Sequence, residues 1–151
     1  MRAAATATAV EMFHSSLERA AAHARFADVF YARFMASSPA VAAIFSGVDV
    51  DKLKRKLRSS LHVMTLAADD APGADLYLDY LGAVHTQLDI RPEMYDAWLD
   101  ALVATVAECD PEFCGAIERA WRSVIGAGVA RIKRAGTEAR STAAAAATAA
   151  D

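Results

Sequence analysis

Apolar side chains recur at intervals of three and four residues along almost the whole chain, and this period constrains the fold more than any other feature. Phe26, Phe30 and Phe34 are spaced four apart, so they share one face of a helix. Three leucines and a methionine form a second such stripe within residues 53–64. Because no stretch alternates for long between apolar and polar residues, the pattern predicts an all-α protein.

Short breaks divide this pattern into about six to eight expected helices around one core. Pro39 is placed to open a short helix, because a first helical position needs no N–H group. Asp49 is placed to cap the helix that follows. Asp110 and Pro111 are typical of the N-cap and first position of a last helix, which would then run to about Ala135.

The 151 residues are enough for one domain with a sizeable core. We expect a flexible N-terminus over residues 1–8, a folded domain over 9–135, and a low-complexity, disordered tail over 136–151. The alanines of the tail could instead extend a helix, since alanine has the highest helix propensity.

Charge and hydropathy exclude several classes of protein. A net charge of −3 argues against nucleic acid as a partner, because nucleic-acid binders carry a basic excess. No run approaches the ~20 apolar residues of a membrane span. Glu11 interrupts the mildly apolar start before a secretory signal could form. With Cys109 and Cys114 read as reduced thiols of no functional weight, we expect a cytoplasmic location.

His85 poses the main functional question, because it ends the apolar helical stretch "ADLYLDYLGAVH" just before a loop. A lone histidine on an apolar face is more often a core residue than a ligand. Tyr31 and Phe45, each taken alone, would be an ordinary boundary residue and an ordinary core residue. We keep the packing interpretation for the other histidines, His14, His23 and His62.

Taken together, four stretches resemble the globin family, and specifically the single-domain bacterial haemoglobins and the haem domain of flavohaemoglobins. They are "FYARFMASSPAVAAIF", "FSGVDVDKLKRKLRSSL", "YLGAVHTQLDIRPEMYDAW", and "ECDPEF" followed by "AIERAW". They are similar to the second helix, the distal helix, the proximal helix and the turn into the last helix. The resemblance runs from about Ala24 to Arg134 and implies a globin fold enclosing a haem b, iron protoporphyrin IX.

The resemblance also implies roles for single residues. His85 takes the position of the proximal ligand to the haem iron, and Tyr31 takes that of the distal tyrosine. A phenol with a reference pKa of about 10 stays protonated near neutral pH, so Tyr31 could donate a hydrogen bond to a bound gas. Lys56 matches a basic residue that reaches a haem propionate. The expected haem contacts are Phe45, Leu53, Lys56, Leu57, Leu81, Ile90 and Tyr95, the last also orienting His85.

The function implied is reversible binding of O₂, and also of NO and CO, at a five-coordinate iron, for oxygen storage, delivery or buffering. The family's glutamate on the last helix falls near Gly136, with Glu138 close but out of register. This disfavours activation of O–O bonds and favours reversible binding. Leu53 stands where the family often has glutamine or histidine, so a second distal donor is missing.

Other functions stay open. One is a nitric oxide dioxygenase that needs a separate reductase, because 151 residues leave no room for flavin and nicotinamide domains. Another is a gas-sensing module, although only an alanine-rich tail follows the helical domain. A third is a helical interaction domain without haem, which His85, Tyr31 and Phe45 together argue against. The chain could be a monomer or a homodimer.

Overall fold

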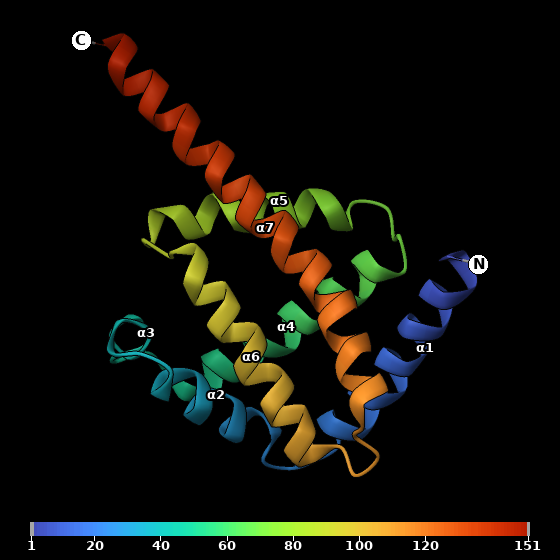
Figure 1. Cartoon of the computed structure of the whole chain (residues 1–151). Coiled ribbons are helices and arrows are strands. Elements are labelled where there is room, and N and C mark those ends of the chain that lie inside the picture. Colours follow the sequence, from blue (N-terminus) through green and yellow to red (C-terminus); the bar gives the residue numbers. More distant parts are fainter. Residues whose placement is uncertain (1, 151) are drawn as a thin grey trace.

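The computed structural model describes residues 2–150, with side chains from residue 9 onward. Met1 and Asp151, the outer ends of the two expected flexible segments, lie outside the described residues. Within the described part the chain forms seven helices and no strand, which confirms the all-α prediction and the expected number of helices (Figure 1). The helices are α1 (Arg2–Ala21), α2 (Phe26–Ala36), α3 (Pro39–Ile44), α4 (Val50–Ala68), α5 (Ala74–Gln87), α6 (Pro92–Cys109) and α7 (Gly115–Ala150).

The starts of α3 and α4 follow from local chemistry. Pro39 opens α3, and the Ser38 hydroxyl accepts a hydrogen bond from the backbone N–H of Val41 at 3.1 Å. Asp49 caps α4 by accepting from the N–H of Asp51 at 2.9 Å. Both caps satisfy N–H groups that a helix start would otherwise leave free. The predictions for Pro39 and Asp49 are therefore confirmed.

The prediction that Asp110 caps the last helix is wrong. α7 begins only at Gly115, and Asp110 is instead the residue that follows α6. Its carboxylate turns inward and is buried, although it also accepts from the N–H of Glu112 at 2.9 Å. A carboxylate at a turn can serve either a helix start or a tertiary contact, and here partners on α1 decide the outcome.

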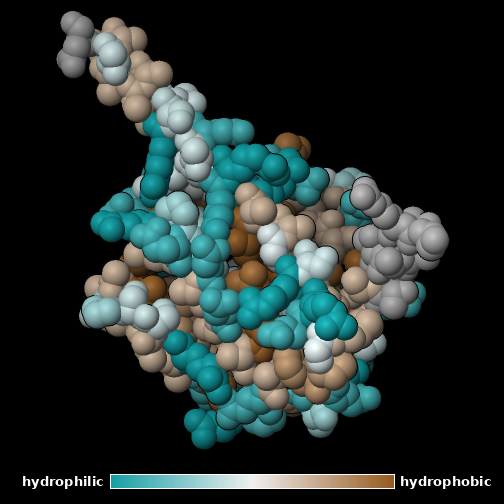
Figure 2. Space-filling view, viewed as in Figure 1, coloured by the Kyte–Doolittle hydropathy of each residue, from teal (hydrophilic) through white to brown (hydrophobic). Residues whose placement is uncertain are grey.

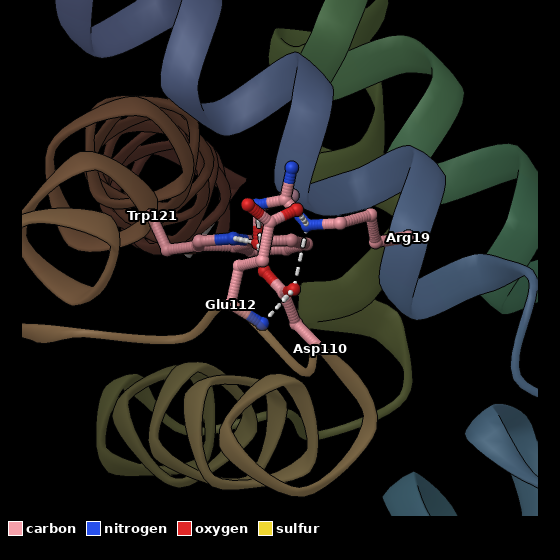
Figure 3. Close-up of polar contacts among 5 residues, drawn as sticks. Arg19, Asp110, Glu112 and Trp121 are labelled. Carbon is pink, nitrogen blue, oxygen red and sulfur yellow. Dashed lines mark hydrogen bonds and ion pairs between the residues drawn. The ribbon is translucent and has the colours of Figure 1, made fainter.

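These partners form a buried polar network that fastens α1 to the turn between α6 and α7 (Figure 3). Asp110 accepts hydrogen bonds from the Ser16 hydroxyl at 2.6 Å and from Nε of Arg19 at 2.6 Å. Ser16 in turn accepts from Nε1 of Trp121 at 2.8 Å. Burial alone would raise the pKa of the Asp110 carboxyl, but the hydrogen bonds from Arg19, Ser16 and the Glu112 N–H outweigh it and hold that pKa below its ordinary value.

α7 is the longest helix and the centre of the packing. It contacts α1, α4, α5 and α6, while α2 packs on α6 and α3 (Figure 1). Phe13, Phe30, Leu102 and Trp121 are fully buried, and the rings of Phe13 and Trp121 meet edge to face with centroids 4.8 Å apart. None of the helices in residues 2–150 has the length and apolar character that crossing a membrane requires.

The two segments expected to be flexible have a helical backbone within residues 2–8 and 136–150. The backbone of α1 is helical from Arg2, and α7 continues to Ala150 through the segment expected to be a disordered tail. The last turns of α7 extend away from the rest of the molecule in Figure 1 and are exposed from Arg140 onward. The alternative of a helix extended by alanines describes this end, and high intrinsic helix propensity is its physical cause.

Candidate functional site

His85 lies in the last turn of α5, and its ring is partly buried. Nδ1 of the ring is buried and has no hydrogen-bond partner. Burial lowers the pKa of His85, so its imidazole is neutral near neutral pH. The carbonyl of Leu81, one turn earlier, raises the pKa of His85 in part. The contact between this carbonyl and the imidazole does not reach ordinary hydrogen-bond geometry. A buried polar atom without a partner is costly, so this one needs an explanation.

The corner between α5 and α6 holds the backbone around His85. The carbonyl of His85 accepts from the N–H groups of Leu88 at 3.1 Å and Ile90 at 3.2 Å. Arg140 of α7 donates from Nη2 to the carbonyl of Ile90 at 2.8 Å. On the other side, Tyr95 of α6 meets His85 edge to face, with ring centroids 6.0 Å apart. α7 therefore holds the backbone next to His85, and Tyr95 of α6 contacts the ring itself.

Tyr31 lies on α2, with 9% of its surface exposed. Its hydroxyl donates to the carbonyl of Leu53 on α4 at 2.5 Å. Its ring meets Phe45 edge to face, with centroids 6.1 Å apart. Burial raises the pKa of Tyr31 to about 12, so the phenol keeps its proton at all physiological pH values. Tyr31 is a buried hydrogen-bond donor in largely apolar surroundings.

α4 contacts both Tyr31 and α5, the helix that carries His85. Leu53 and Leu57 are buried one turn apart on it, as the apolar stripe predicted. Lys56 is exposed on the same helix, yet its charge is one of the influences that lower the pKa of His85.

α5 and α7 cross at two glycines next to His85. A Cβ atom on Gly82 would lie 2.5 Å from the carbonyl oxygen of Ile132, so the backbones touch there and only glycine fits. Gly136 is buried on the other side of this crossing, beside Thr86. The position expected to correspond to the family's glutamate is therefore a packing contact in this chain.

The structure arranges the predicted site residues in two groups. Tyr31, Phe45 and Leu53 are joined by direct contacts on one side. His85, Ile90 and Tyr95 are joined on the other. Phe45, Leu81 and Tyr95 are partly buried residues packed against the hydrophobic core, and Lys56 lies at the edge.

Sequence reasoning missed Arg140 and Gly82. Arg140 lies in the segment interpreted as a disordered tail, and nothing in its neighbourhood distinguishes it from a solvated arginine. Gly82 did give a signal, because a glycine inside the apolar stretch "YLGAVH" indicates a close approach by another backbone.

The donor set can hold a metal only with help from another molecule. Among the described residues, no group of three or more histidine, cysteine, aspartate or glutamate side chains lies close enough to bind a metal ion. One neutral imidazole could nevertheless bind iron if a macrocycle supplied the remaining nitrogen ligands. The unpartnered His85, the buried leucines and the Tyr31 donor fit a flat, apolar, metal-carrying group.

A separate cavity of about 220 Å³ lies between α4, α5 and α7. It is lined by apolar residues such as Met64, Leu78 and Val124 and bordered by Arg131 and Arg134. On the face in Figure 2, apolar brown groups lie in recesses between hydrophilic teal ones. None of the predicted site residues lines this cavity, so we do not assign it to the site.

Comparison with known proteins bears on the whole arrangement. The family model described as Globin matches residues 28–132. A solved structure from Pseudomonas aeruginosa PAO1, described as structurally highly homologous to a human hemoglobin, is similar with a TM-score of 0.80 and 40% sequence identity. The match covers 84% of this chain and 97% of that one. Among curated proteins, none matches this chain.

Proposed function

This chain belongs to the globin family, whose members bind haem and gas ligands, and we propose that it binds O₂ reversibly, and also NO and CO. The role would be oxygen storage, delivery or buffering. The observation that carries the proposal is His85, a partly buried neutral imidazole whose Nδ1 has no partner. His85 lies at the end of α5 with Tyr95 against its ring. Such a neighbour would orient the imidazole for binding an iron.

The cofactor that we propose is haem b. When bound, a haem would supply an iron that binds a protein nitrogen and a diatomic gas. Cys109 and Cys114 are five residues apart and Cys109 is buried, so they do not form the pair that attaches a c-type haem covalently. The residues that would hold the cofactor are His85 at the iron, Lys56 at a propionate, and Phe45, Leu53, Leu57, Leu81, Ile90 and Tyr95 against the ring.

Tyr31 would stabilise the gas ligand. Its phenol has one proton, which the carbonyl of Leu53 accepts at 2.5 Å. That carbonyl belongs to the first turns of α4, so a rotation of the hydroxyl could redirect the proton to a ligand above Leu53 and Leu57. The aliphatic side chains of the two leucines offer no competing donor and exclude water. A single donor in a dry site favours slow release of O₂.

A second candidate function is nitric oxide dioxygenase, and the buried Tyr31 donor favours it equally well. Turnover would require electrons from a separate reductase. Against this function, Gly136 is packed against α5, and no carboxylate among the described residues hydrogen-bonds His85. A gas sensor, a cytoplasmic location and the choice between monomer and homodimer remain predictions of the sequence.

The first experiment is an absorption spectrum of the purified protein in its ferric, dithionite-reduced and CO-treated forms. We expect a Soret band that shifts on reduction and again with CO. His85→Ala should lose the histidine-ligated spectrum, whereas the control His62→Ala, an exposed histidine of α4, should keep it. Absence of haem uptake by the wild type would refute the proposal. Catalytic consumption of NO with a supplied reductase would favour the dioxygenase.

A further inference from the structure

The end of α7 reaches the backbone that carries His85. Arg140 lies four residues beyond Gly136, in the helical extension that the sequence analysis treated as a tail. Its Nη2 donates to the Ile90 carbonyl at 2.8 Å. In Figure 1 α7 crosses α5, and its red end then runs away from the other helices. The extension therefore has a specific contact before it leaves the body of the molecule.

This contact leads directly to the histidine. The peptide group before Ile90 donates its N–H to the His85 carbonyl at 3.2 Å, while the Ile90 carbonyl accepts from Arg140. Asp89, between them, has a φ of 56°, so the corner is a tight turn that a residue other than glycine adopts only when held. A backbone fixed at Ile90 fixes the last turn of α5, from which the imidazole projects.

Arg140 differs from two other arginines of α7, Arg122 and Arg131. Arg122 pairs with the carboxylate of Asp100, and Arg131 pairs with that of Asp79, as surface arginines usually do. Arg140 instead donates to a main-chain carbonyl of the corner.

We infer that Arg140 is a positioning residue for the haem ligand: by tying α7 to the Ile90 carbonyl, it limits the orientations that the His85 imidazole adopts. The inference rests on the proposed function for the haem itself. It also gives the part of α7 beyond Gly136 a role at the site, since without that extension the guanidinium could not reach the corner.

The test compares Arg140→Ala with Arg122→Ala in the haem-loaded protein. Both variants remove one charge and one hydrogen bond between α7 and a neighbouring element, but only Arg140 contacts the corner. The first readout is the iron–histidine stretching band in the resonance Raman spectrum of the ferrous protein. The second is hydrogen exchange at the Ile90 amide, which one lost hydrogen bond should speed by about 2- to 10-fold.

We expect the band to broaden or shift in Arg140→Ala and to stay unchanged in Arg122→Ala. An unchanged band in Arg140→Ala overturns the inference, and so does an equal change in both variants, which would reveal a general effect of charge. If the wild type binds no haem, the proposed function fails separately. Exchange at Ile90 would then still show whether Arg140 holds the corner, and an unchanged rate would overturn that as well.

Discussion

Asp110 and His85 are both polar residues with buried atoms, but their surroundings are opposite. The Asp110 carboxylate accepts hydrogen bonds from Ser16, Arg19 and the N–H of Glu112. Nδ1 of His85 has no partner, and the ring touches only Tyr95 among the aromatic residues described. The buried carboxylate of Asp110 is thus satisfied by groups within the chain, whereas Nδ1 of His85 has no hydrogen-bond partner there.

This difference separates a residue that serves folding from one that serves binding. A satisfied buried network rigidifies the fold, and the α1 network does so where the long helix begins. A polar group without a partner lowers stability, so its presence indicates a role other than folding. The two regions should therefore respond to substitution in opposite ways.

The largest effect on stability should come from Asp110→Ala. The variant leaves the buried Ser16 hydroxyl without its acceptor and Arg19 without its closest partner. We expect the free energy of unfolding to fall by about 2–4 kcal/mol, a range reduced because Arg19 is partly exposed. Chemical denaturation measures this, with Asp100→Ala as control, because Asp100 makes only an exposed ion pair with Arg122.

The contribution of Asp110 to the free energy of unfolding depends on pH, and the direction follows from its lowered pKa. The pKa of Asp110 is lowered in the folded protein, so its contribution is present in full above the unfolded pKa of about 3.9. The contribution is lost as the pH falls through the folded pKa. The difference between wild type and Asp110→Ala should thus be constant near pH 7 and shrink below about pH 4. A constant difference throughout acid would contradict the assigned network.

Tyr31 is intermediate between Asp110 and His85. Its hydroxyl donates to the Leu53 carbonyl, but it could donate to a bound ligand instead. Tyr31→Phe should speed O₂ dissociation by roughly 5- to 150-fold, the equivalent of about 1–3 kcal/mol for one buried hydrogen bond. Stopped-flow measurement of O₂ release tests this. Since the pKa of Tyr31 is about 12, the wild-type rate should not change with pH up to about 10 through this group. An unchanged off-rate in Tyr31→Phe would remove Tyr31 from this role.

Gly82→Ala tests how the close packing of α5 on α7 holds the helix that carries His85. The added Cβ would lie 2.5 Å from the Ile132 carbonyl oxygen, so α5 and α7 must move apart. We expect a loss of stability of about 1–3 kcal/mol and weaker haem retention, because α5 carries the ligand. Gly126→Ala is the matched control, since its nearest contact is 4.0 Å away and it should stabilise α7 slightly. Equal behaviour of the two variants would contradict the close crossing.

Sequence patterns predicted the helices better than they predicted the contacts between them. Periodicity and caps are local, so the α4 stripe and the Pro39 and Asp49 starts could be predicted from the residues alone. Asp110 was misinterpreted because its partners Ser16 and Arg19 are more than ninety residues away. Arg140 was missed because it lies in the segment interpreted as a tail and its partner Ile90 is 50 residues away. The globin resemblance, in contrast, came from several residues at fixed spacings.

The smallest expected effect tests most directly whether His85, unlike Asp110, is dispensable for folding. In the haem-free protein, His85→Leu replaces a ring whose Nδ1 has no partner with an apolar side chain. The free energy of unfolding should therefore stay constant or rise by about 1 kcal/mol, since an unsatisfied buried nitrogen is costly. His14→Leu, which loses a hydrogen bond to Asp69, should not gain stability. Denaturation of the haem-free proteins decides the matter. A loss of about 2 kcal/mol or more in His85→Leu would mean that His85, like Asp110, serves the fold.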